Sequence, residues 1–497
     1  MRLEPTQRHQ RHIFLNPLHG PTTLHCPIML FHTQHRIPSR GEPMETERTA
    51  NLGLEADLLG VPCPPQLNRW LETLPDDLLS ILETFANDGH GVWLVGGCVR
   101  DAWLGEDAQD IDLCTSCPPE RMLALFGDQA IATGVEFGTV TLKGTSTLYE
   151  ATTLRTESLY RDGRRPEHVA WGSSLKEDLS RRDFTFNSMA IDVARRLLYD
   201  PYDGVTDMEQ RVVRAVGDAG LRCREDALRI LRAYRFLNRD QGPLWTMELR
   251  LQNAVREHRE RLKMVAVERH WMELEKILTT PLSGRVLAKM NEDGVFETVF
   301  GEGQRPRNSL LLLNDLPTLG SLTLHERLAL MMAEWPTKSV VHQLKALKVP
   351  KALLRNTAVF HERLAHLPRP RQAELRVFAH VLQDSAAAHL GIRESLNHVA
   401  AMIHGKPTHN EELEAVLTAW ENLPVRKTPE NCLVDGHWIM ARTGVEQGLR
   451  LGRLKDWLHR IQIEEDLTSA DQMEHALSRL PFTHGDHNLW PKVSFPS

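Results

Sequence analysis

The amino-acid sequence predicts an α+β protein in which a small mixed-sheet domain precedes a much longer all-helical region. Two observations indicate this fold class. Between residues 92 and 199, short apolar and β-branched runs alternate with helical patterns, as in a sheet covered by helices. Beyond Glu225 nearly every segment has helical periodicity, and proline separates one segment from the next.

Residues 1–65 are predicted to be a disordered extension. Residues 1–43 contain five arginines but only two acids, and prolines such as Pro17 and Pro21 interrupt any amphipathic helix. Met44 is a candidate for the true start. The sequence leaves open whether residues 1–43 are translated, disordered or a targeting segment.

The first elements of the mixed-sheet domain follow this extension. Apolar residues at helical spacing predict a helical pair or one bent helix over Leu67–Ala86. The apolar run Val92–Val95 predicts a buried strand, which a pair of glycines ends. Cys98–Leu104 is then predicted to be a helix, and Asp110–Cys114 a second strand.

The remaining elements of this domain are shorter or less regular. Pro118–Phe126 predicts a helix with proline in its first turn. The β-branched runs Thr139–Lys143 and Leu148–Leu154 predict a hairpin. We expect a helix over Leu175–Val193 and a short strand over Leu197–Tyr199.

The glycine pair Gly96–Gly97 gives the first chemical signal, because it lies between a strand and a helix. Glycine lets the backbone approach a ligand closely, and a helix N-terminus favours an anion. Arg100, one turn into the helix, can pair with a triphosphate. This segment therefore predicts a phosphate site.

The Asp110-Ile-Asp112 segment gives the second signal. Two aspartates that are two residues apart on a strand project from the same face. Their hard oxygen ligands suit Mg²⁺, and two such ions can assist phosphoryl transfer. Asp110 and Asp112 are therefore the predicted metal ligands and catalytic residues.

Each signal alone is common at turns and strand ends, but their order and spacing resemble the class II tRNA nucleotidyltransferase and bacterial poly(A) polymerase family. The resemblance implies a DNA polymerase beta-like nucleotidyltransferase head followed by an all-helical neck, body and tail. We expect the head at 66–195, the neck with base recognition at 196–265, the body at 266–370 and a tRNA-binding tail at 371–497.

The segment Lys176–Ala190 resembles the second motif of this family. The resemblance implies that Arg182 contacts the nucleotide, and that Asp183 and Asn187 shape the ribose side of the pocket. Without this context, Arg181 and Arg182 would be read as an exposed helix face.

Two neighbouring segments also resemble the family. Tyr149–Arg155 resembles the strand that follows the active-site strand, and Glu150 within it is either a third catalytic carboxylate or a surface residue of the hairpin. Tyr160–Pro166 resembles a flexible loop that the family uses for adding the terminal A.

The segment Glu225–Phe236 resembles the base-reading motif of the family neck. On one helix, Asp226 and Arg229 would share a face, with Arg232 continuing the row, and Arg235 is a further candidate for nucleotide binding. A carboxylate accepts from an exocyclic amino group and a guanidinium donates to ring acceptors, so the pair can read cytosine or adenine. The alternative is a simple ion pair within the helix.

The tail carries a weaker resemblance over 434–466, where glycines recur at 444, 448 and 452. Its basic residues either meet tRNA phosphates or lie on a solvated helix; they are Arg442, Arg450, Arg453 and Lys455.

The bulk composition excludes other classes of protein. A net charge of −7 is unsuited to a non-specific nucleic-acid coat protein, and no run of eighteen apolar residues suggests a membrane helix. Seven scattered cysteines suit a reducing cytoplasm. Cys114 and Cys117 form a C-x-x-C pair, but no matching ligands for zinc follow, so we interpret them as half-buried thiols.

The resemblance implies an enzyme that adds CCA, or part of it including the terminal A, to tRNA from CTP and ATP. The alternatives are a poly(A) polymerase that uses ATP on general RNA, a CC-only enzyme, and a catalytically idle RNA-binding protein. The complete loop segment and the lack of a long basic tail disfavour the poly(A) polymerase. The sequence leaves the oligomeric state open.

Overall fold

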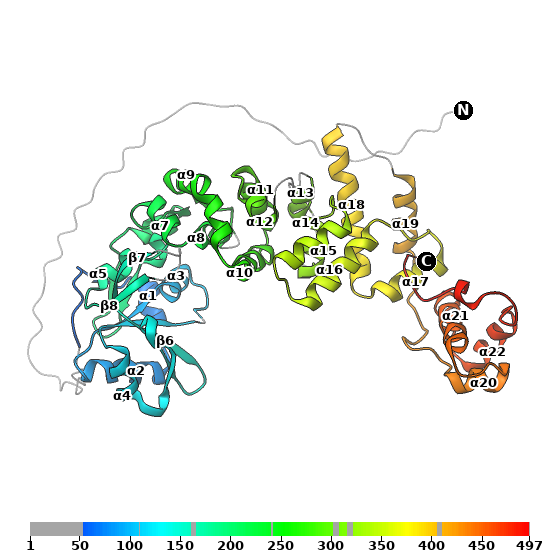
Figure 1. Ribbon diagram of the computed structural model, residues 1–497, viewed down its shortest axis with the longest axis horizontal. Helices are drawn as coiled ribbons and strands as arrows, with labels where there is room; N and C mark the ends of the chain where they lie inside the picture. The colour runs from blue at the N-terminus through cyan, green and yellow to red at the C-terminus, as the bar shows by residue number, and fades with distance from the viewer. Residues whose placement is uncertain are drawn as a thin grey trace, which may run out of the picture. The chain divides into compact units, whose positions relative to one another are not determined.

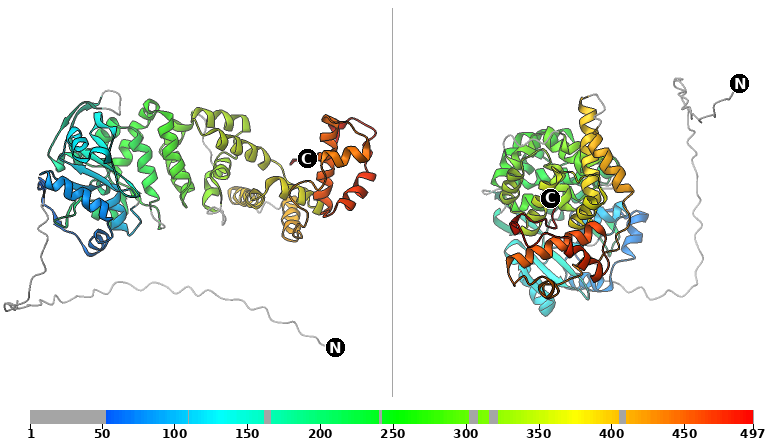
Figure 2. Two further views of the ribbon diagram at one scale, coloured as in Figure 1. Left: turned by 90° about the horizontal axis from the view of Figure 1, so that it is seen from below. Right: turned by 90° about the vertical axis from the view of Figure 1, so that its right-hand side faces the viewer.

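The computed structural model describes residues 53–108, 110–160, 166–239, 242–301, 308–315, 322–404 and 410–496. Figures 1 and 2 show them as ribbons. Within these ranges every strand lies before residue 248, and only helices follow. The predicted α+β fold class is therefore confirmed.

An eight-stranded mixed sheet forms the centre of the head, in the order β1-β10-β9-β2-β3-β6-β5-β4. β3 and β6 pair in parallel, and all other neighbours are antiparallel. Its strands are β1 (Val61–Pro62), β2 (Val92–Val95), β3 (Asp112–Thr115), β4 (Ala130–Gly134), β5 (Thr139–Lys143), β6 (Leu148–Thr153), β9 (Ala190–Asp192) and β10 (Leu197–Tyr199).

Strand β1 corrects the prediction of an extension up to residue 65. Val61 and Pro62 pair with Leu198 and Leu197 of β10, so the sheet already begins here. Gly60 lets the chain come this close, because a Cβ there would lie 2.9 Å from the Tyr199 ring. Residues 1–52 lie outside the described part of the chain.

Two small sheets accompany the large one. β7 (Arg155–Tyr160) pairs antiparallel with β8 (Pro166–Trp171), and β11 (Val212–Val213) pairs in parallel with β12 (Thr246–Met247).

Short helices surround the sheet, and most of them match the predicted positions. The helical pair before the first long strand is present, as is the helix after the glycine pair. These helices are α1 (Pro65–Leu71), α2 (Asp76–Asn87), α3 (Gly97–Leu104), α4 (Pro119–Phe126), α5 (Leu175–Ser180) and α6 (Gly204–Glu209).

The helix predicted over Leu175–Val193 is wrong beyond Ser180. The chain forms a turn, a short 3-10 helix over Thr185–Asn187 and then strand β9. Asp183 causes this break, because its carboxylate accepts from the backbone N–H of Phe184 and from the Asn187 side chain. Such local bonds offer the backbone an alternative to the helical ladder.

The chain beyond the head is helical, as predicted. Its helices are α7 (Ala219–Glu225), α8 (Leu228–Leu237), α9 (Leu249–His258), α10 (Val267–Leu278), α11 (Ser283–Glu292), α12 (Val295–Phe300), α13 (Ser309–Asp315), α14 (Leu324–Met331), α15 (Thr337–Ala346), α16 (Lys351–Leu364), α17 (Gln372–Leu382), α18 (Ser385–His404), α19 (Glu411–Glu421), α20 (Gly436–Thr443), α21 (Leu449–Glu465) and α22 (Ala470–Ser478).

One core of buried side chains is continuous from Cys63 in the head to Val399 in α18. Within it, Phe236 of α8 packs against Phe184 and Phe186, with ring centroids 5.5 Å and 5.1 Å apart. This contact fixes α8 against the segment that follows α5. A separate core unites α20, α21 and α22. No helix within the described ranges combines the length and apolarity that crossing a membrane requires.

Candidate active site

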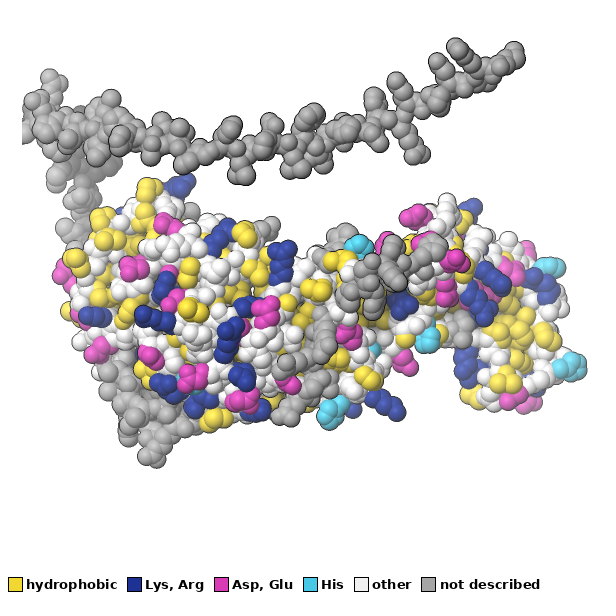
Figure 3. All heavy atoms as spheres, turned by 90° about the horizontal axis from the view of Figure 1, so that it is seen from above, with side chains coloured by type: hydrophobic (Ala, Val, Ile, Leu, Met, Phe, Trp, Pro, Cys, Tyr) yellow, Lys and Arg dark blue, Asp and Glu magenta, His cyan; other side chains and the backbone are white. Residues whose placement is uncertain are grey.

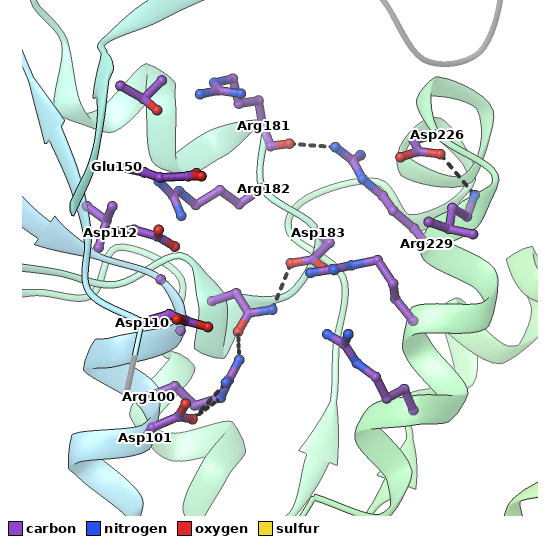
Figure 4. Close-up of a pocket in the computed structure, with 18 of the residues that line it drawn as sticks. Arg100, Asp101, Asp110, Asp112, Glu150, Arg181, Arg182, Asp183, Asp226 and Arg229 are labelled. Carbon is purple, nitrogen blue, oxygen red and sulfur yellow. Dashed lines mark hydrogen bonds and ion pairs between the residues drawn. The ribbon is translucent and has the colours of Figure 1, made fainter. Parts of the chain in front are cut away.

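A pocket of about 950 Å³ is lined by the head strands, the segment 181–187, helix α8 and one residue of α10. Figure 4 shows it close up. Among the described residues, nine arginines and eight carboxylates line it. Its volume suits a ligand of nucleotide size. On the face of the molecule that Figure 3 shows, basic and acidic side chains are interspersed and form no continuous basic surface.

Three carboxylates gather on the head side of this pocket. Asp112 is the first residue of β3, and in the parallel register of β3 and β6 it lies opposite Glu150. Residues that face each other on neighbouring strands project to the same side of a sheet, so Glu150 stands beside Asp112. Asp110 precedes the strand, and its carboxylate points to the same side in Figure 4. The position of Glu150 is compatible with the predicted third carboxylate beside the two aspartates.

The predicted strand over Asp110–Cys114 begins two residues too early. On the β2 side, Asp112 pairs with Val95, the last residue of that strand. Gly96 then turns away with a φ of 76°, so β2 offers no partner for Asp110. Asp110 therefore reaches the pocket from the loop before β3, and not from the strand itself.

The three carboxylates repel one another. Although Asp112 keeps contact with solvent, the surrounding protein desolvates its carboxylate and raises its pKa to about 6. Arg182 opposes this shift, while Glu150 and Asp110 add to it. None of the three forms an ion pair within the described residues. A divalent cation would relieve this repulsion.

Gly96 holds a position that no other residue would fit. Its positive φ is strained for any residue with a side chain, and a Cβ would come 2.7 Å from Nη1 of Arg182. Arg182 therefore lies directly over the turn between β2 and α3. The first intrahelical bond of α3 runs from the N–H of Arg100 to the carbonyl of Gly96, so the N–H groups of residues 97–99 precede the ladder.

Four of the predicted nucleotide-binding residues form one hydrogen-bonded chain from head to neck. The Arg100 guanidinium donates to Asn187 Oδ1 at 2.5 Å, and Asn187 donates to Asp183 at 2.9 Å. Asp183 in turn accepts from Arg232 of α8 at 2.6 and 2.7 Å. Arg100, Asn187 and Asp183 are all buried.

The Asp183 carboxylate is ionised in this chain. Burial alone would raise its pKa, but Arg232, Asn187 and Arg229 outweigh the burial and hold the pKa well below its usual range. Asp183 therefore organises the pocket wall that joins head and neck.

The predicted shared helix face of Asp226 and Arg229 is wrong. α7 ends at Glu225 and α8 begins at Leu228, with Asp226 between them in extended conformation at φ −141° and ψ 103°. Asp226 Oδ1 accepts from the N–H of Leu228 and so interrupts the helix. Its ion-pair partner is Arg269 of α10 and not Arg229, with the closest contact at 2.8 Å.

Arg229 is held by other groups. Its Nη1 donates to Glu225 at 2.8 Å and to the Arg222 carbonyl at 3.3 Å. Its Nη2 donates to the Arg181 carbonyl at 2.8 Å, which ties α8 to the end of α5. Asp226 and Arg229 both line the pocket opposite the carboxylates, as Figure 4 shows.

Several pocket residues are not among those that the sequence identifies. Arg239, just beyond the end of α8, pairs with Asp101 and Glu106 of the head, and Arg269 reaches the pocket from α10. Arg235, which was predicted, pairs with Glu273 of α10 at 3.2 Å. The four-residue spacing of Arg269 and Glu273 places them one turn apart, but only the packing of α10 against α8 shows what they meet.

The C-x-x-C pair forms no zinc site with four ligands in the described residues. Both thiols are buried, which exceeds the predicted half-burial. Cys117 lies near Asp88 and His90, a set whose ligand atoms are close enough for a metal ion. However, Arg121 engages both oxygens of Asp88, and burial raises the pKa of the Cys117 thiol to about 12. Asp88 and Cys117 are therefore not available as anionic ligands for a cation.

The tail arginines have partners of their own. Arg442 lies 4.1 Å from the centroid of the Trp438 ring and pairs with Glu474, and Arg450 donates to the Phe482 carbonyl. Whether they also meet phosphates stays a prediction. The Tyr160–Pro166 loop stays one too, because residues 161–165 lie outside the described part of the chain.

Two family models match the chain. The model described as the poly A polymerase head domain matches residues 92–214. The model described as the probable RNA and SrmB-binding site of polymerase A matches residues 246–305. The two matches include the carboxylate set and helix α10.

Curated proteins match over most of the chain. The CCA-adding enzyme of Lactobacillus johnsonii is 31% identical over 392 residues, which are 78% of this chain and 92% of that protein. The CCA-adding enzyme of Geobacillus kaustophilus is 31% identical over 405 residues, or 81% and 96% of the two chains.

Solved structures show the same fold. The Bacillus stearothermophilus CCA-adding enzyme in complex with CTP matches with a TM-score of 0.61 and 27% identity, over 84% of this chain and 99% of that one. The Thermotoga maritima CCA-adding enzyme, complexed with tRNA, matches with a TM-score of 0.58 at 18% identity, over 83% and 98%.

Proposed function

Since the chain belongs to the family of CCA-adding enzymes, we propose that it is the template-independent nucleotidyltransferase that completes the 3′ CCA end of tRNA from CTP and ATP. One observation carries this proposal: a carboxylate set and a pre-oriented Asp226 and Arg229 face each other across one pocket. In the reaction, the 3′-hydroxyl oxygen of tRNA bonds to the α-phosphorus, the hydroxyl loses its proton, and pyrophosphate leaves.

Nucleotidyltransferases of this family use divalent metal ions, and we propose Mg²⁺ held by Asp110 and Asp112. The fit rests on the donor set, because hard carboxylate oxygens without cationic partners are the ligands that Mg²⁺ prefers. Bound there, the cation supplies charge neutralisation to the attacking hydroxyl and to the departing pyrophosphate. Glu150 adds a third negative charge beside them.

The triphosphate site is proposed between the carboxylates and α3. The Gly96–Gly97 turn leaves its backbone accessible, and Arg182 lies over it. Arg100 is buried and already bonded to Asp101 and Asn187, so its charge acts on the phosphates while those bonds hold it in place. Asp183 and Asn187 complete this wall on the ribose side.

Base selection is proposed to follow from the donors and acceptors that remain open on Asp226 and Arg229. A guanidinium has five N–H donors. Arg229 uses two on Nη1 and one on Nη2, which leaves Nε–H and one Nη2–H among the described contacts. Those two donors are available to ring acceptors of a base.

This remaining pattern suits the two bases that build CCA. Cytosine offers an amino donor beside ring acceptors, and so does adenine, which matches one carboxylate acceptor beside a guanidinium edge. Uracil and guanine present a carbonyl where Asp226 would need a donor. The pocket therefore accepts CTP and ATP and rejects UTP and GTP.

The products on defined tRNAs test the proposal. We expect transcripts that lack three, two or one of the CCA nucleotides to be extended with CTP and ATP to the complete end, and not further. Addition that stops at CC despite ATP would assign the chain to the CC-only enzymes and contradict the role of the Tyr160–Pro166 loop. Long A tracts on unrelated RNA would instead favour a poly(A) polymerase. We propose that this reaction takes place in the cytoplasm, which fractionation of cells would test.

A further inference from the structure

Helix α10 presents two charged side chains to the base-reading segment. Arg269 pairs with Asp226, and Glu273, one turn further on, pairs with Arg235 of α8. α10 also packs along α8 through a shared core that includes Trp271 and Leu274. The ion pair of Arg269 therefore ties the Asp226 side chain to helix α10.

The Asp226 carboxylate is almost fully used by these contacts. Oδ1 accepts from the Leu228 N–H at 3.0 Å and from Arg269 Nη1 at 3.3 Å. Oδ2 accepts from Arg269 Nη2 at 2.8 Å. A carboxylate has about four acceptor sites, so one site on Oδ2 is left within the described residues.

We propose that Arg269 is a positioning residue that determines base specificity by holding Asp226 so that a single acceptor faces the incoming base. This inference rests on the proposed function of the pocket. Arg269 acts through Asp226: its planar fork fixes the rotation of the carboxylate and occupies the acceptors that a wrong base could use.

The surroundings explain why such a clamp is needed. Asp226 stands between two helices in extended conformation, and its backbone bonds to Arg222 and Arg229 hold the main chain but not the rotation of the carboxylate. Its side chain is 21% exposed, and several arginines line the same pocket. Without Arg269, the Asp226 carboxylate would be free to rotate toward another guanidinium and would no longer be oriented toward the base.

A double-mutant cycle tests this coupling on the full-length enzyme. The variants are Arg269→Ala, Asp226→Ala and the double variant, with Arg269→Lys as the conservative replacement. Lys276→Ala is the matched control, because it removes an exposed positive charge from the same helix without touching Asp226. For each variant, kcat and KM are measured for CTP and for UTP on a tRNA that lacks CCA, and Tm reports folding.

We expect Arg269→Ala to raise KM for CTP with a smaller change in kcat, and to lower the CTP-over-UTP preference roughly tenfold or more. Lysine, which keeps the charge but not the fork, should restore only part of the preference. In the Asp226→Ala background, loss of Arg269 should change the preference no further. Lys276→Ala should behave as the wild type.

Two results would overturn the inference. One is an unchanged preference in a folded Arg269→Ala enzyme; the other is an equal loss of preference with and without Asp226, which would mean that Arg269 acts independently of it. A wild-type enzyme that fails to extend the tRNA would refute the proposed function instead, so the two failures are distinguishable.

Discussion

Asp112 in the head and Asp226 in the neck line the same pocket, but the protein surrounds them differently. Asp112 lies beside Glu150 and Asp110, and none of the three has an ion-pair partner within the described residues. Asp226 is clamped by Arg269, and Arg229 by Glu225 and two backbone carbonyls.

The difference shows two ways of preparing a charged site. In the proposed function, the carboxylates that bind a cation repel one another beforehand, so that binding the cation relieves the repulsion. The groups proposed to read a base are fixed in advance, because a rotating carboxylate or guanidinium could not discriminate between similar bases. One wall of the pocket, with Asp110, Asp112 and Glu150, has no ion-pair partners among the described residues, and we call it the uncompensated wall. The opposite wall, with Asp226 and Arg229, has such partners, and we call it the compensated wall.

The largest expected effect comes from removing one charge of the uncompensated wall. Asp110→Asn or Asp112→Asn should lower the rate of nucleotide addition roughly a thousandfold or more, equivalent to about 4 kcal/mol in the barrier. Without metal, Tm should stay the same or rise, since repulsion is removed. The measurements are CMP incorporation and thermal unfolding; more than a few per cent of activity in both variants would contradict the metal assignment.

Removing a reader from the compensated wall should instead alter selectivity. Asp226→Ala and Arg229→Ala leave a polar partner unmatched, typically at a cost of about 1–3 kcal/mol. UTP and GTP incorporation should therefore rise relative to CTP and ATP, while triphosphate binding changes little. Arg224→Ala, at an arginine half exposed on α7, serves as the control. Unaltered discrimination in both variants would contradict the base-reading role and leave Asp226 and Arg229 as structural partners of Arg269 and Glu225.

Glu150 sharpens the comparison, because its sequence context did not decide its role. Glu150→Gln keeps the shape of the side chain and removes one negative charge beside Asp112. We expect about tenfold more Mg²⁺ for half-maximal activity, with the rate at saturating Mg²⁺ reduced less. An unchanged requirement for Mg²⁺ would make Glu150 an ordinary surface residue of the hairpin.

The smallest expected effect is a difference in how two pocket carboxylates respond to pH. The pKa of Asp183 is lowered, so its stabilising contribution is present above the ordinary carboxyl pKa of about 3.9 and is lost as the pH falls below it. The pKa of Asp112 is raised to about 6, so its contribution is lost as the pH rises from about 4 through 6.

Chemical unfolding without metal from about pH 2 to pH 7 measures this difference. Asp112→Asn should gain stability relative to the wild type as the pH rises, by about 1 kcal/mol or less after solvent screening. Asp183→Asn should show the opposite trend below about pH 4, where the wild type loses its advantage. Parallel pH curves for both variants would mean that the two carboxylates have similar surroundings.

The sequence by itself determined the fold class, the glycine turn and most of the residues that line the pocket of the proposed reaction. Gly96–Gly97, Asp112 and Asp226 are local signals, because turn geometry, strand spacing and residue type can be read from a few neighbouring positions. The same local patterns misjudged where elements end. Asp183 and Asp226 break helices by bonding to nearby N–H groups, and helical periodicity does not register such bonds.

Only the tertiary structure decided which partners these residues take. Glu150 meets Asp112 because β3 and β6 pair in parallel, and Arg269 meets Asp226 from 43 residues away because α10 packs against α8. Spacing along the chain predicted a shared helix face for Asp226 and Arg229, but local bonding took Asp226 out of the helix, and each residue has another ion-pair partner. Ion pairs depend on distance in space, and packing sets that distance over separations that no sequence period covers.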